Sequence, residues 1–522
     1  MILRWPLFAG IVLLASPATA APNTIDIVRD LAARVGPIVG SAQACSDIER
    51  ARVQVITNKF AAVIQEASAD PVARNSLSQV FERNVRDGAN LVTSNRMDCA
   101  AAERQLAELE RSLGIAKSSS GLSSVIAPSP AAAATAPAAQ LPAPADAGPA
   151  VHGITENEIR FGIVGPFTGA ARELGRQMKL GVDTAFNRAN ESGGVNGRQL
   201  KLISADDGYE PTRTLDAMKQ LYDKDQVFGF IGNVGTPTAA VGIPYALQQK
   251  ALFFGAFTGA SILRHDPPDR YVFNYRAGYA EETDAVVRYL IKLRHLQPRQ
   301  IAVFAQQDAY GDAGFAGVAK AFRLLGIDDG GILRLGYKRN TVDVEDAVNQ
   351  LKQQKGAVRA VVMVATYRAA AKFIEKTHDL FPGIVYTNVS FVGSTELASE
   401  LMLLGPRFAD GVVVTQVVPA VGGFSSEVLE YKTALAKYFP GENVDYVSLE
   451  GYVAANVLIE ALKRAGPQLD VERLVDTLEN MRNLDLGLGV PLGFGRAEHQ
   501  ASHKIWGTAL DDKGKYQSIE LE

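Results

Sequence analysis

The sequence predicts an α/β protein with two Rossmann-like lobes, preceded by a small all-α bundle and a disordered Ala/Pro linker. Residues 151–522 alternate short apolar runs with helical stretches, residues 21–115 place apolar residues only at helical spacing, and residues 116–150 are rich in alanine and proline. The length of 522 residues suits roughly three compact units. Hydrophobic residues make up 47% of the chain, enough for large cores.

The first twenty residues, MILRWPLFAGIVLLASPATA, have the pattern of a secretory signal peptide. Arg4 supplies the positive start, an apolar run follows, and Ala18-Thr19-Ala20 fits the small-x-small rule, so we expect cleavage after Ala20. The apolar run is shorter than the ~20 residues that a membrane span needs. We therefore expect a soluble mature chain in the periplasm.

Residues 21–115 predict a bundle of three or four helices. Its two cysteines, Cys45 and Cys99, are the only ones in the chain, and in an oxidising compartment we expect them to form a disulfide. A metal or redox pair is the alternative, but their spacing matches no CxxC motif. The helical stripes are Ile25, Val28, Leu31 and Val35; Val53, Ile56, Phe60, Val63 and Ile64; and Leu106, Leu109 and Leu113.

Residues 116–150 predict an extended linker, because they contain 13 Ala, 6 Pro and 6 Ser and no aromatic residue. After the linker, two series of strands alternate with helices, which predicts two lobes, each with a parallel sheet. The expected strands are Ile159–Val164, Leu200–Ala205, Phe228–Ile231 and Leu252–Gly255, then Ile301–Ala305, Ile332–Leu335, Val361–Val364 and Phe391–Gly393.

The motif inventory argues against an enzyme. The chain has no GxxxxGK[ST] and no GxSxG, and the glycines after the first strand are spaced GxxGxxxG rather than GxGxxG. His499 and His503 fit packing better than metal binding, and Asp206-Asp207 is typical of a turn. A formal charge of −4 argues against a nucleic-acid partner. We expect no catalytic residues, no metal and no cofactor.

Small polar and aromatic residues follow the predicted strands, where α/β sheets bind their ligands. Hydroxyls and amides at helix N-termini favour an anion, although Thr236 followed by Pro237 also suits a simple N-cap. Phe167, Tyr310 and Tyr367 fit either a pocket lining or packing within the lobes. The loops are Pro166–Gly169, Gly232–Thr238, Gly255–Ser261, Asp308–Asp312, Thr366–Tyr367 and Ser394–Glu396.

Residues from about 154 to 522 resemble the type I periplasmic solute-binding proteins of ABC importers, in the branch around the leucine/isoleucine/valine-binding protein. The resemblance is carried by IRFGIVGPFTGAARELG, GGVNGRQLKLISADDGYEPTR, GFIGNVGTPTAAVGIPYALQQKALFFGAFTGAS and IAVFAQQDAYGD. It implies two lobes joined by three crossings, with lobe 1 at about 154–279 and 419–490 and lobe 2 at about 280–418 and 491–522. The bundle and the linker have no counterpart in that family.

The resemblance also implies a site. Thr236 takes the position of the hydroxyl that holds a ligand carboxylate, and Thr258 supplies a hydroxyl in the next loop. Tyr310 takes the position of the lobe 2 tyrosine that covers the ligand, and Tyr367 that of a second lobe 2 aromatic. The candidate ligand-binding residues are Phe167, Thr168, Leu174, Gly235, Thr236, Ala256, Phe257, Thr258, Tyr310, Tyr367, Thr395 and Glu396.

Several positions depart from the amino-acid binders. Leu174 replaces a cleft aromatic, and Thr395 stands where those proteins carry the glutamate that pairs with the ligand ammonium, with Glu396 one residue later. A buried ammonium needs a carboxylate partner, so amino-acid specificity is in question. Tyr209 and Gly235 occupy the positions of a lobe 1 disulfide.

These features predict the periplasmic solute-binding component of an ABC importer. It would capture an amino acid or similar small carboxylate ligand in the cleft between the lobes by hinge closure, and deliver it to a permease in the inner membrane. The alternative is a ligand-sensing or scaffolding periplasmic protein that acts through a protein partner bound by the helical bundle.

Overall fold

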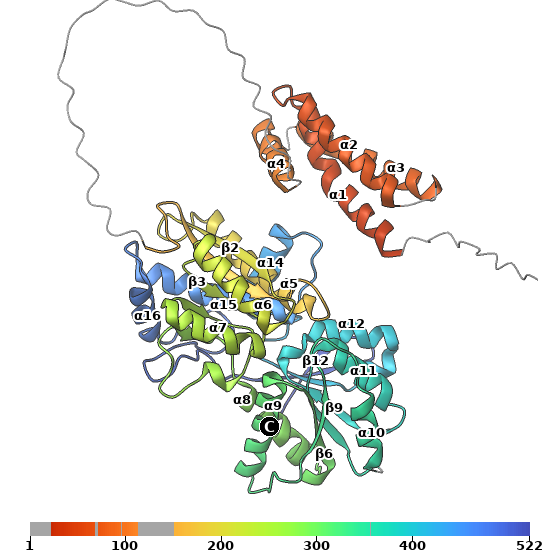
Figure 1. Ribbon diagram of the computed structural model, residues 1–522, viewed down its shortest axis with the longest axis vertical. Helices are drawn as coiled ribbons and strands as arrows, with labels where there is room; N and C mark the ends of the chain where they lie inside the picture. Colours follow the sequence, from red (N-terminus) through yellow and green to blue (C-terminus); the bar gives the residue numbers. More distant parts are fainter. Residues whose placement is uncertain (1–21, 68–70, 95–96, 113–150, 355, 522) are drawn as a thin grey trace, which may run out of the picture. The chain divides into compact units, whose positions relative to one another are not determined.

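The computed structural model describes residues 22–67, 71–94, 97–112, 151–354 and 356–521 (Figure 1). The expected signal peptide and Ala/Pro linker lie outside these residues. The chain divides into two compact units, residues 1–139 and residues 140–522.

The first unit is a helical bundle with its own hydrophobic core. Helix α1 packs closely on α3, because a Cβ at Gly40 would lie only 1.8 Å from the Val85 carbonyl oxygen. Arg52 joins α2 to α4 through hydrogen bonds of 2.8 Å to Glu110 and 2.7 Å to Glu103. The helices are α1 (Pro22–Ala44), α2 (Arg50–Ala67), α3 (Pro71–Thr93) and α4 (Cys99–Ser112).

A disulfide staples the bundle. Cys45 follows the end of α1 and Cys99 begins α4, and the two residues are bonded with a Cα–Cα distance of 5.6 Å. The bond encloses a long stretch of chain, with a sequence separation of 54 residues. It therefore constrains the unfolded chain and supports a unit with a small core.

The second unit contains two lobes. Lobe 1 has a five-stranded parallel sheet in the order β2-β1-β3-β4-β5. Its strands are β1 (Glu158–Gly165), β2 (Gln199–Asp206), β3 (Gly229–Ile231), β4 (Leu252–Phe254) and β5 (Val272–Phe273). Its helices are α5 (Arg172–Glu191), α6 (Pro211–Lys219), α7 (Thr236–Gln249), α14 (Ser426–Tyr438), α15 (Tyr446–Ala465) and α16 (Val471–Glu479).

Lobe 2 has a seven-stranded sheet in the order β12-β11-β10-β9-β8-β6-β7, parallel except for β11 and β12. Its strands are β6 (Ile301–Gln306), β7 (Leu333–Tyr337), β8 (Ala360–Val364), β9 (Val385–Asn388), β10 (Val413–Gln416), β11 (Trp506–Leu510) and β12 (Tyr516–Ile519). Its helices are α8 (Tyr279–Arg288), α9 (Ala309–Leu324), α10 (Glu345–Gln353), α11 (Tyr367–Thr377), α12 (Ser394–Leu404) and α13 (Pro406–Ala409).

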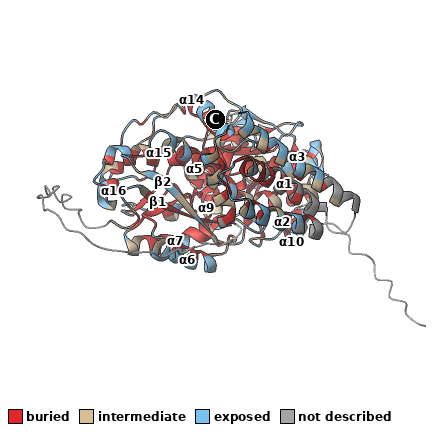
Figure 2. Ribbon diagram, turned by 90° about the horizontal axis from the view of Figure 1, so that it is seen from above, coloured by how far each residue is buried: buried red, intermediate tan, exposed pale blue. Residues whose placement is uncertain are grey.

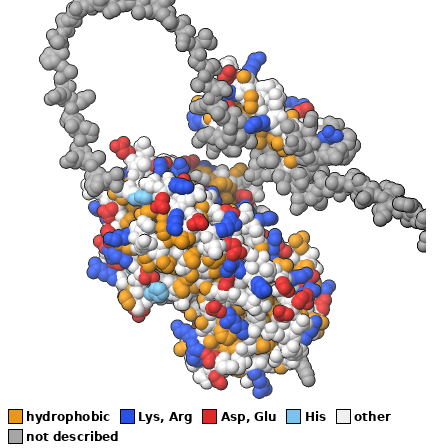
Figure 3. All heavy atoms as spheres, in the orientation of Figure 1, with side chains coloured by type: hydrophobic (Ala, Val, Ile, Leu, Met, Phe, Trp, Pro, Cys, Tyr) orange, Lys and Arg blue, Asp and Glu red, His pale blue; other side chains and the backbone are white. Residues whose placement is uncertain are grey.

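Burial follows the layered arrangement. Buried residues run along the inner strands of both sheets and along the inner faces of α5 and α15, whereas the edge strands β2 and β12 are mostly exposed or partly buried (Figure 2). Charged side chains of both signs are interspersed over the visible face of the two-lobed unit (Figure 3), in keeping with the formal charge of −4. The predicted α/β class, with parallel sheets after a helical extension, is confirmed.

One predicted strand is wrong. The strand expected at Phe391–Gly393 is instead a short 3-10 turn over Ser390–Val392, because β9 ends earlier, at Asn388. Phe391 and Val392 are nevertheless fully buried. A short apolar run signals burial rather than a particular backbone, and here the burial comes from contact between the lobes.

Three segments connect the lobes and are tied to one another. The first and third run side by side, since Asn274 accepts a hydrogen bond of 2.8 Å from the Ala501 amide. The Tyr275 hydroxyl donates to the Val417 carbonyl of the second at 2.9 Å. Phe494, ahead of the third segment, packs edge-on against Phe273 of lobe 1.

Loss of the disulfide is expected to weaken the bundle alone. Replacing both Cys45 and Cys99 by serine should lower the free energy of unfolding of the bundle by about 2–4 kcal/mol, because the unfolded chain regains its loop entropy. Denaturant titration of the mature chain, followed by circular dichroism, measures this change. The transition of the two-lobed unit is the internal control, and an unmoved bundle transition would contradict the prediction.

Candidate functional site

The candidate site lies where the carboxyl ends of the two sheets face each other. One continuous hydrophobic cluster includes Val164 and Phe257 of lobe 1 together with Tyr310 and Phe391 of lobe 2. The two lobes are therefore in contact in this structure, and their facing loops are buried.

A pair of hydroxyls forms the polar part of lobe 1. The N-cap of α7 is Gly235, with φ of 108°, so Thr236 is already helical and the expectation that it acts as the N-cap is wrong. Its hydroxyl instead bonds Thr258 at 2.6 Å, and both side chains are at most 1% exposed. The amide nitrogen of the Asn233 side chain, on the same loop, is buried without a hydrogen-bond partner.

Aromatic rings from both lobes surround Phe391. Phe391 stacks on Phe257 with ring centroids 4.9 Å apart and contacts Tyr310 at 4.6 Å. Tyr279 and Tyr209 approach it at 6.5 Å and 6.1 Å. All five side chains are at most 1% exposed. These residues are called the aromatic cluster below.

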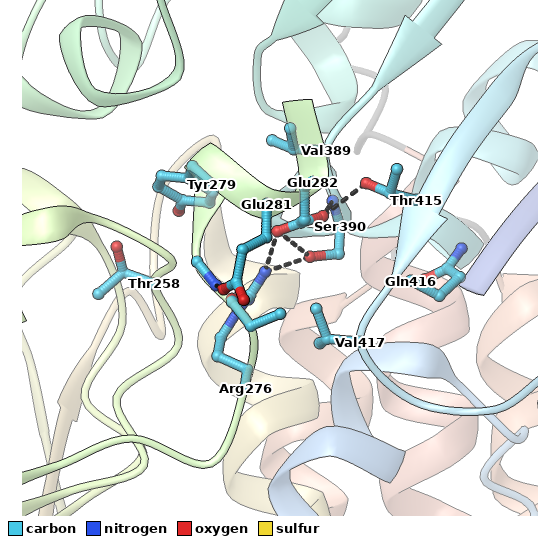
Figure 4. A network of polar contacts seen from close by, with 12 residues as sticks. Thr258, Arg276, Tyr279, Glu281, Glu282, Val389, Ser390, Thr415, Gln416 and Val417 are labelled. Atoms are coloured by element: carbon cyan, nitrogen blue, oxygen red, sulfur yellow. Dashed lines mark hydrogen bonds and ion pairs between the residues drawn. The ribbon is translucent and has the colours of Figure 1, made fainter. Parts of the chain in front are cut away.

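Two hydroxyls of the aromatic cluster are unsatisfied. The Tyr310 hydroxyl is buried without a hydrogen-bond partner, and burial raises the pKa of this residue well above its usual value. The Tyr279 hydroxyl lies near Thr258 (Figure 4) but makes no hydrogen bond of normal geometry. Buried donors are rarely left unpaired, so such groups point to a missing partner.

Tyr209 fills the space that Gly235 leaves. A Cβ at Gly235 would lie 2.3 Å from the Tyr209 ring, so only glycine admits the ring there. Tyr209 itself has φ of 62°, which costs a non-glycine residue roughly 1–3 kcal/mol. Its hydroxyl accepts from Gln306 of lobe 2 at 3.3 Å, and Gln306 accepts from Tyr337 at 2.9 Å. Tyr209 and Gly235, for which the resemblance implies a disulfide in the amino-acid binders, here pack on each other, and Tyr209 contacts lobe 2.

A second polar contact joins the lobes at the rim. Arg339 of lobe 2 contacts Glu210 of lobe 1 at 2.9 Å while also holding Asp308 of its own lobe at 2.8 Å. Asn340 donates to Glu210 at 2.7 Å and to the Gly208 carbonyl at 3.1 Å. Tight closure thus depends on ion pairs as well as on apolar packing.

The remaining candidates make contacts with other residues than the hydroxyl pair. The Tyr367 hydroxyl donates to the Ala170 carbonyl at 2.7 Å, and Leu174 packs against Gly393, where a Cβ would lie 2.6 Å from it. Thr395 stands beside the Asp445 carboxyl. Burial raises the pKa of this carboxyl, and the contact with the Thr395 side chain offsets part of that rise. Glu396 is half-buried on the first turn of α12, and its pKa is raised by burial and by nearby Glu173 and Asp445.

Phe167 and Thr168 lie in a turn that Asp206 holds; the Phe167 ring is partly buried against the hydrophobic cluster, and Thr168 is exposed. The Phe167 amide donates to Asp206 at 2.8 Å, and the Thr168 hydroxyl does so at 2.6 Å. Burial disfavours the Asp206 carboxylate, but these bonds and those of Gly208 and Arg213 outweigh it and lower its pKa to about 2. Asp206 thus fastens a loop, and no metal-binding group of three or more His, Cys, Asp or Glu occurs among the described residues.

A buried ionic network underlies the site (Figure 4). Arg276, in the first crossing, is 1% exposed and donates to Glu282 of α8 at 2.7 Å. It also donates to Ser390 and, at 3.4 Å, to Glu450 of α15. Glu282 further accepts from the Thr415 hydroxyl at 2.5 Å. The network connects both lobes through the hinge.

A groove of about 550 Å³ opens beside Tyr279. It lies between the loop after β4 and helix α9, so it connects the edge of the aromatic cluster with solvent between the lobes. Its lining contains the cations Arg264, Lys320 and Arg323 but only one carboxylate, Glu281.

Six of the candidate residues therefore lie together around the hydroxyl pair and the aromatic cluster: Gly235, Thr236, Ala256, Phe257, Thr258 and Tyr310. The sequence did not identify Tyr279 or Phe391 as site residues, and it treated Tyr209 only as a lost cysteine position. Phe391 could have been found from the sequence by its place just after strand β9, since ligands of α/β sheets bind at the carboxyl ends of strands.

A family model described as periplasmic binding protein matches residues 158–515. The chain belongs to this family. The resemblance to type I periplasmic solute-binding proteins is thereby confirmed, and so is the prediction that the chain is not an enzyme. The bundle precedes the matched region.

Relatives within the periplasmic binding proteins include Leu/Ile/Val-binding protein homolog 3 of Brucella melitensis, 24% identical over 64% of this chain and 86% of that protein. An amino acid binding protein of Pseudomonas aeruginosa is 24% identical over 69% of this chain and 92% of its own length. Within the described ranges, no helix has the length and apolar character of a membrane span.

Solved structures share the fold. A possible leucine/isoleucine/valine-binding protein from Rhodopirellula baltica superposes with a TM-score of 0.66, at 38% identity over 72% of this chain and 99% of that one. A branched-chain amino acid ABC transporter protein from Thermus thermophilus with bound valine gives 0.61 at 18% identity, over 70% and 96%.

Removing the rim ion pair is expected to open the lobes. Arg339→Met should raise the open-to-closed ratio by roughly 2- to 5-fold, the effect of losing a partly exposed pair. Small-angle X-ray scattering measures the accompanying increase in radius of gyration. Arg334→Met is the matched control, because Arg334 pairs with Asp312 within lobe 2. Identical scattering from the two variants would contradict this role.

Proposed function

We propose that this protein is the periplasmic solute-binding component of an ABC importer. It captures an amino acid or similar small carboxylate ligand between its lobes and delivers it to a membrane permease. The observation that carries the proposal is the set of buried, unsatisfied donors on facing loops, above all the Tyr310 hydroxyl. A ligand with acceptor oxygens supplies the partner that these donors lack.

The ligand would bind first to lobe 1. The Thr236 and Thr258 hydroxyls, at 2.6 Å from each other, and the first amides of α7 would hold its carboxylate. Tyr310 of lobe 2 would then close over it. Because the ligand contacts both lobes only in the closed state, its binding shifts the population toward that state.

The cellular setting follows from the same proposal. Export would use the signal peptide expected at residues 1–20, and the disulfide between Cys45 and Cys99 is of the kind that persists in an oxidising compartment. The names of the relatives favour branched-chain amino acids as one ligand class to test.

A second candidate is a sensing or scaffolding protein that acts through the bundle. It is favoured by one observation: the bundle has its own core and disulfide and lies outside the region that matches the family. Cross-linking of the mature full-length chain in cells, followed by mass spectrometry, separates the candidates. Capture of a permease supports import, and capture of an envelope protein at the bundle supports the alternative.

Loss of the proposed donors is expected to abolish binding. The double variant Thr236→Ala and Tyr310→Phe removes two bonds to a charged group, worth about 3–6 kcal/mol, so affinity for the amino acid or small carboxylate that the unaltered protein binds should fall by about 100-fold or more. Isothermal titration calorimetry measures the affinity.

Thr433→Ala is the matched control for this prediction, because Thr433 is exposed on α14 and bonds only its own helix at 2.9 Å. Unchanged affinity in the double variant would show that the carboxylate binds elsewhere.

A further inference from the structure

We infer that a pocket beside the second crossing binds a primary amine with an apolar body, and that the carboxylate of Asp445 is the partner of its ammonium group. The inference goes beyond the proposed function, because the groups that carry it belong neither to the hydroxyl pair nor to the aromatic cluster. It depends on two buried acceptors that lack hydrogen-bond partners and on the space beside them.

The pocket lies between the two lobes and has a volume of about 750 Å³. Lobe 2 contributes α12 and the turn between β11 and β12, and lobe 1 contributes the start of α15. Met402, Val421 and Val444 supply apolar wall. Tyr446 of lobe 1 and Tyr516 of lobe 2 also line it, edge-on to each other with ring centroids 5.6 Å apart. A molecule seated in this pocket therefore contacts both lobes.

Asp445 places a buried charge at the edge of the pocket. Its neighbours Val444 and Tyr446 both line the pocket, and so does Thr395 of lobe 2, which stands beside the carboxyl. One carboxylate oxygen, Oδ1, accepts from two amides in the first turn of α15, at 2.7 Å and 3.0 Å. The other, Oδ2, is buried without a hydrogen-bond partner, and the residue is 1% exposed. Such an oxygen points to a donor that the described residues do not supply.

The cation whose charge acts most directly on Asp445 is engaged elsewhere. Arg176 is the arginine that lowers the pKa of this carboxyl. Its guanidinium forms ion pairs with Glu173 at 2.6 Å and with Glu442 at 2.9 Å. The charge of Asp445 is therefore left for a ligand.

A second buried acceptor faces the same region. The side-chain oxygen of Gln177 is buried without a partner, and the residue is 5% exposed. On the same face of α5, Leu174 contacts Gly393, the residue before α12, and Gly181 lies against the Ser448 carbonyl of α15, where a Cβ would be 1.9 Å away. Gln177 is one turn from each of these contacts, so it lies between the starts of α12 and α15.

Two acceptors without donors suit an ammonium group, which has three N–H donors and no acceptor. Burial raises the pKa of Asp445, and an ammonium beside it would offset this rise by stabilising the carboxylate. The apolar wall requires an apolar ligand body. Lys513 and Lys515, exposed on the turn that borders the pocket, accommodate a carboxylate as well, so a simple amine and an amino acid both fit.

Three compounds with one carbon body test the inference on the mature full-length protein by isothermal titration calorimetry. They are L-leucine, 3-methylbutan-1-amine, which lacks its carboxylate, and 4-methylpentanoic acid, which lacks its ammonium. The titrations are repeated in the variant with Thr236→Ala and Tyr310→Phe, whose proposed carboxylate site is disabled. In that variant the amine should bind at least about 10-fold more tightly than the acid, because only the amine supplies charged donors to Asp445.

An isosteric change isolates the charge. Asp445→Asn keeps an oxygen that can cap α15 but removes the carboxylate, so affinity for the amine should fall by about 10-fold or more. The melting temperature of the ligand-free protein should not fall, because an unpaired buried charge is lost. Asp470→Asn is the matched control, since Asp470 is an exposed N-cap of α16 that accepts from the Arg473 amide at 2.8 Å.

A second change tests the pocket itself. Ser399→Trp should weaken amine binding by filling the pocket, and Thr433→Trp should not. Both are exposed helix residues whose hydroxyls bond a carbonyl one turn earlier, at 3.0 Å and 2.9 Å, but only Ser399 lines the pocket.

Equal amine affinity in Asp445→Asn and Asp470→Asn, or no binding of the amine at all, would overturn the inference. Binding of the acid that is lost in the variant with Thr236→Ala and Tyr310→Phe would in either case leave the proposed function standing. The failure of the inference and the failure of the proposed function are therefore distinguishable.

Discussion

The buried guanidinium of Arg276 is the constraint on which the arrangement of the lobes depends. It lies in the first crossing, and its charge is compensated by Glu282 of lobe 2 and Glu450 of lobe 1. Leaving such a charge unpaired costs about 3–5 kcal/mol, so both helices that carry these carboxylates must stay close to the hinge. The same network fixes Ser390, and with it the turn that presents Phe391 to the cleft.

Buried polar groups need hydrogen-bond partners in the hinge and in the cleft alike, but only some of them have partners. In the hinge, Glu282 accepts hydrogen bonds from Arg276, Ser390 and Thr415, so this buried carboxylate is satisfied without a ligand. In the cleft, the Tyr310 hydroxyl has no partner. An acceptor oxygen placed between the lobes would supply the partner that the Tyr310 hydroxyl lacks.

Much of the fold followed from the sequence, because strands and helices alternate with clear periodicity, and the resemblance placed Thr236, Thr258 and Tyr310 near one another. The contacts between lobes did not follow. Phe391 sits in a short apolar run that reads as a strand, and Tyr209 gains its role only because Gly235 lies beneath its ring. Such contacts join residues far apart in the chain, so the local sequence pattern does not predict them.

The rim contact between Arg339 and Glu210 is sensitive to the salt concentration around the protein. Its side chains are 22% and 39% exposed, so dissolved ions reach them. Salt at physiological concentration screens charges beyond a Debye length of ~8 Å and weakens exposed pairs. The hydroxyl pair and the aromatic cluster are at most 1% exposed, so dissolved ions do not reach them. Ionic strength in the surrounding medium therefore weakens this rim contact more than it weakens the contacts of the hydroxyl pair and the aromatic cluster.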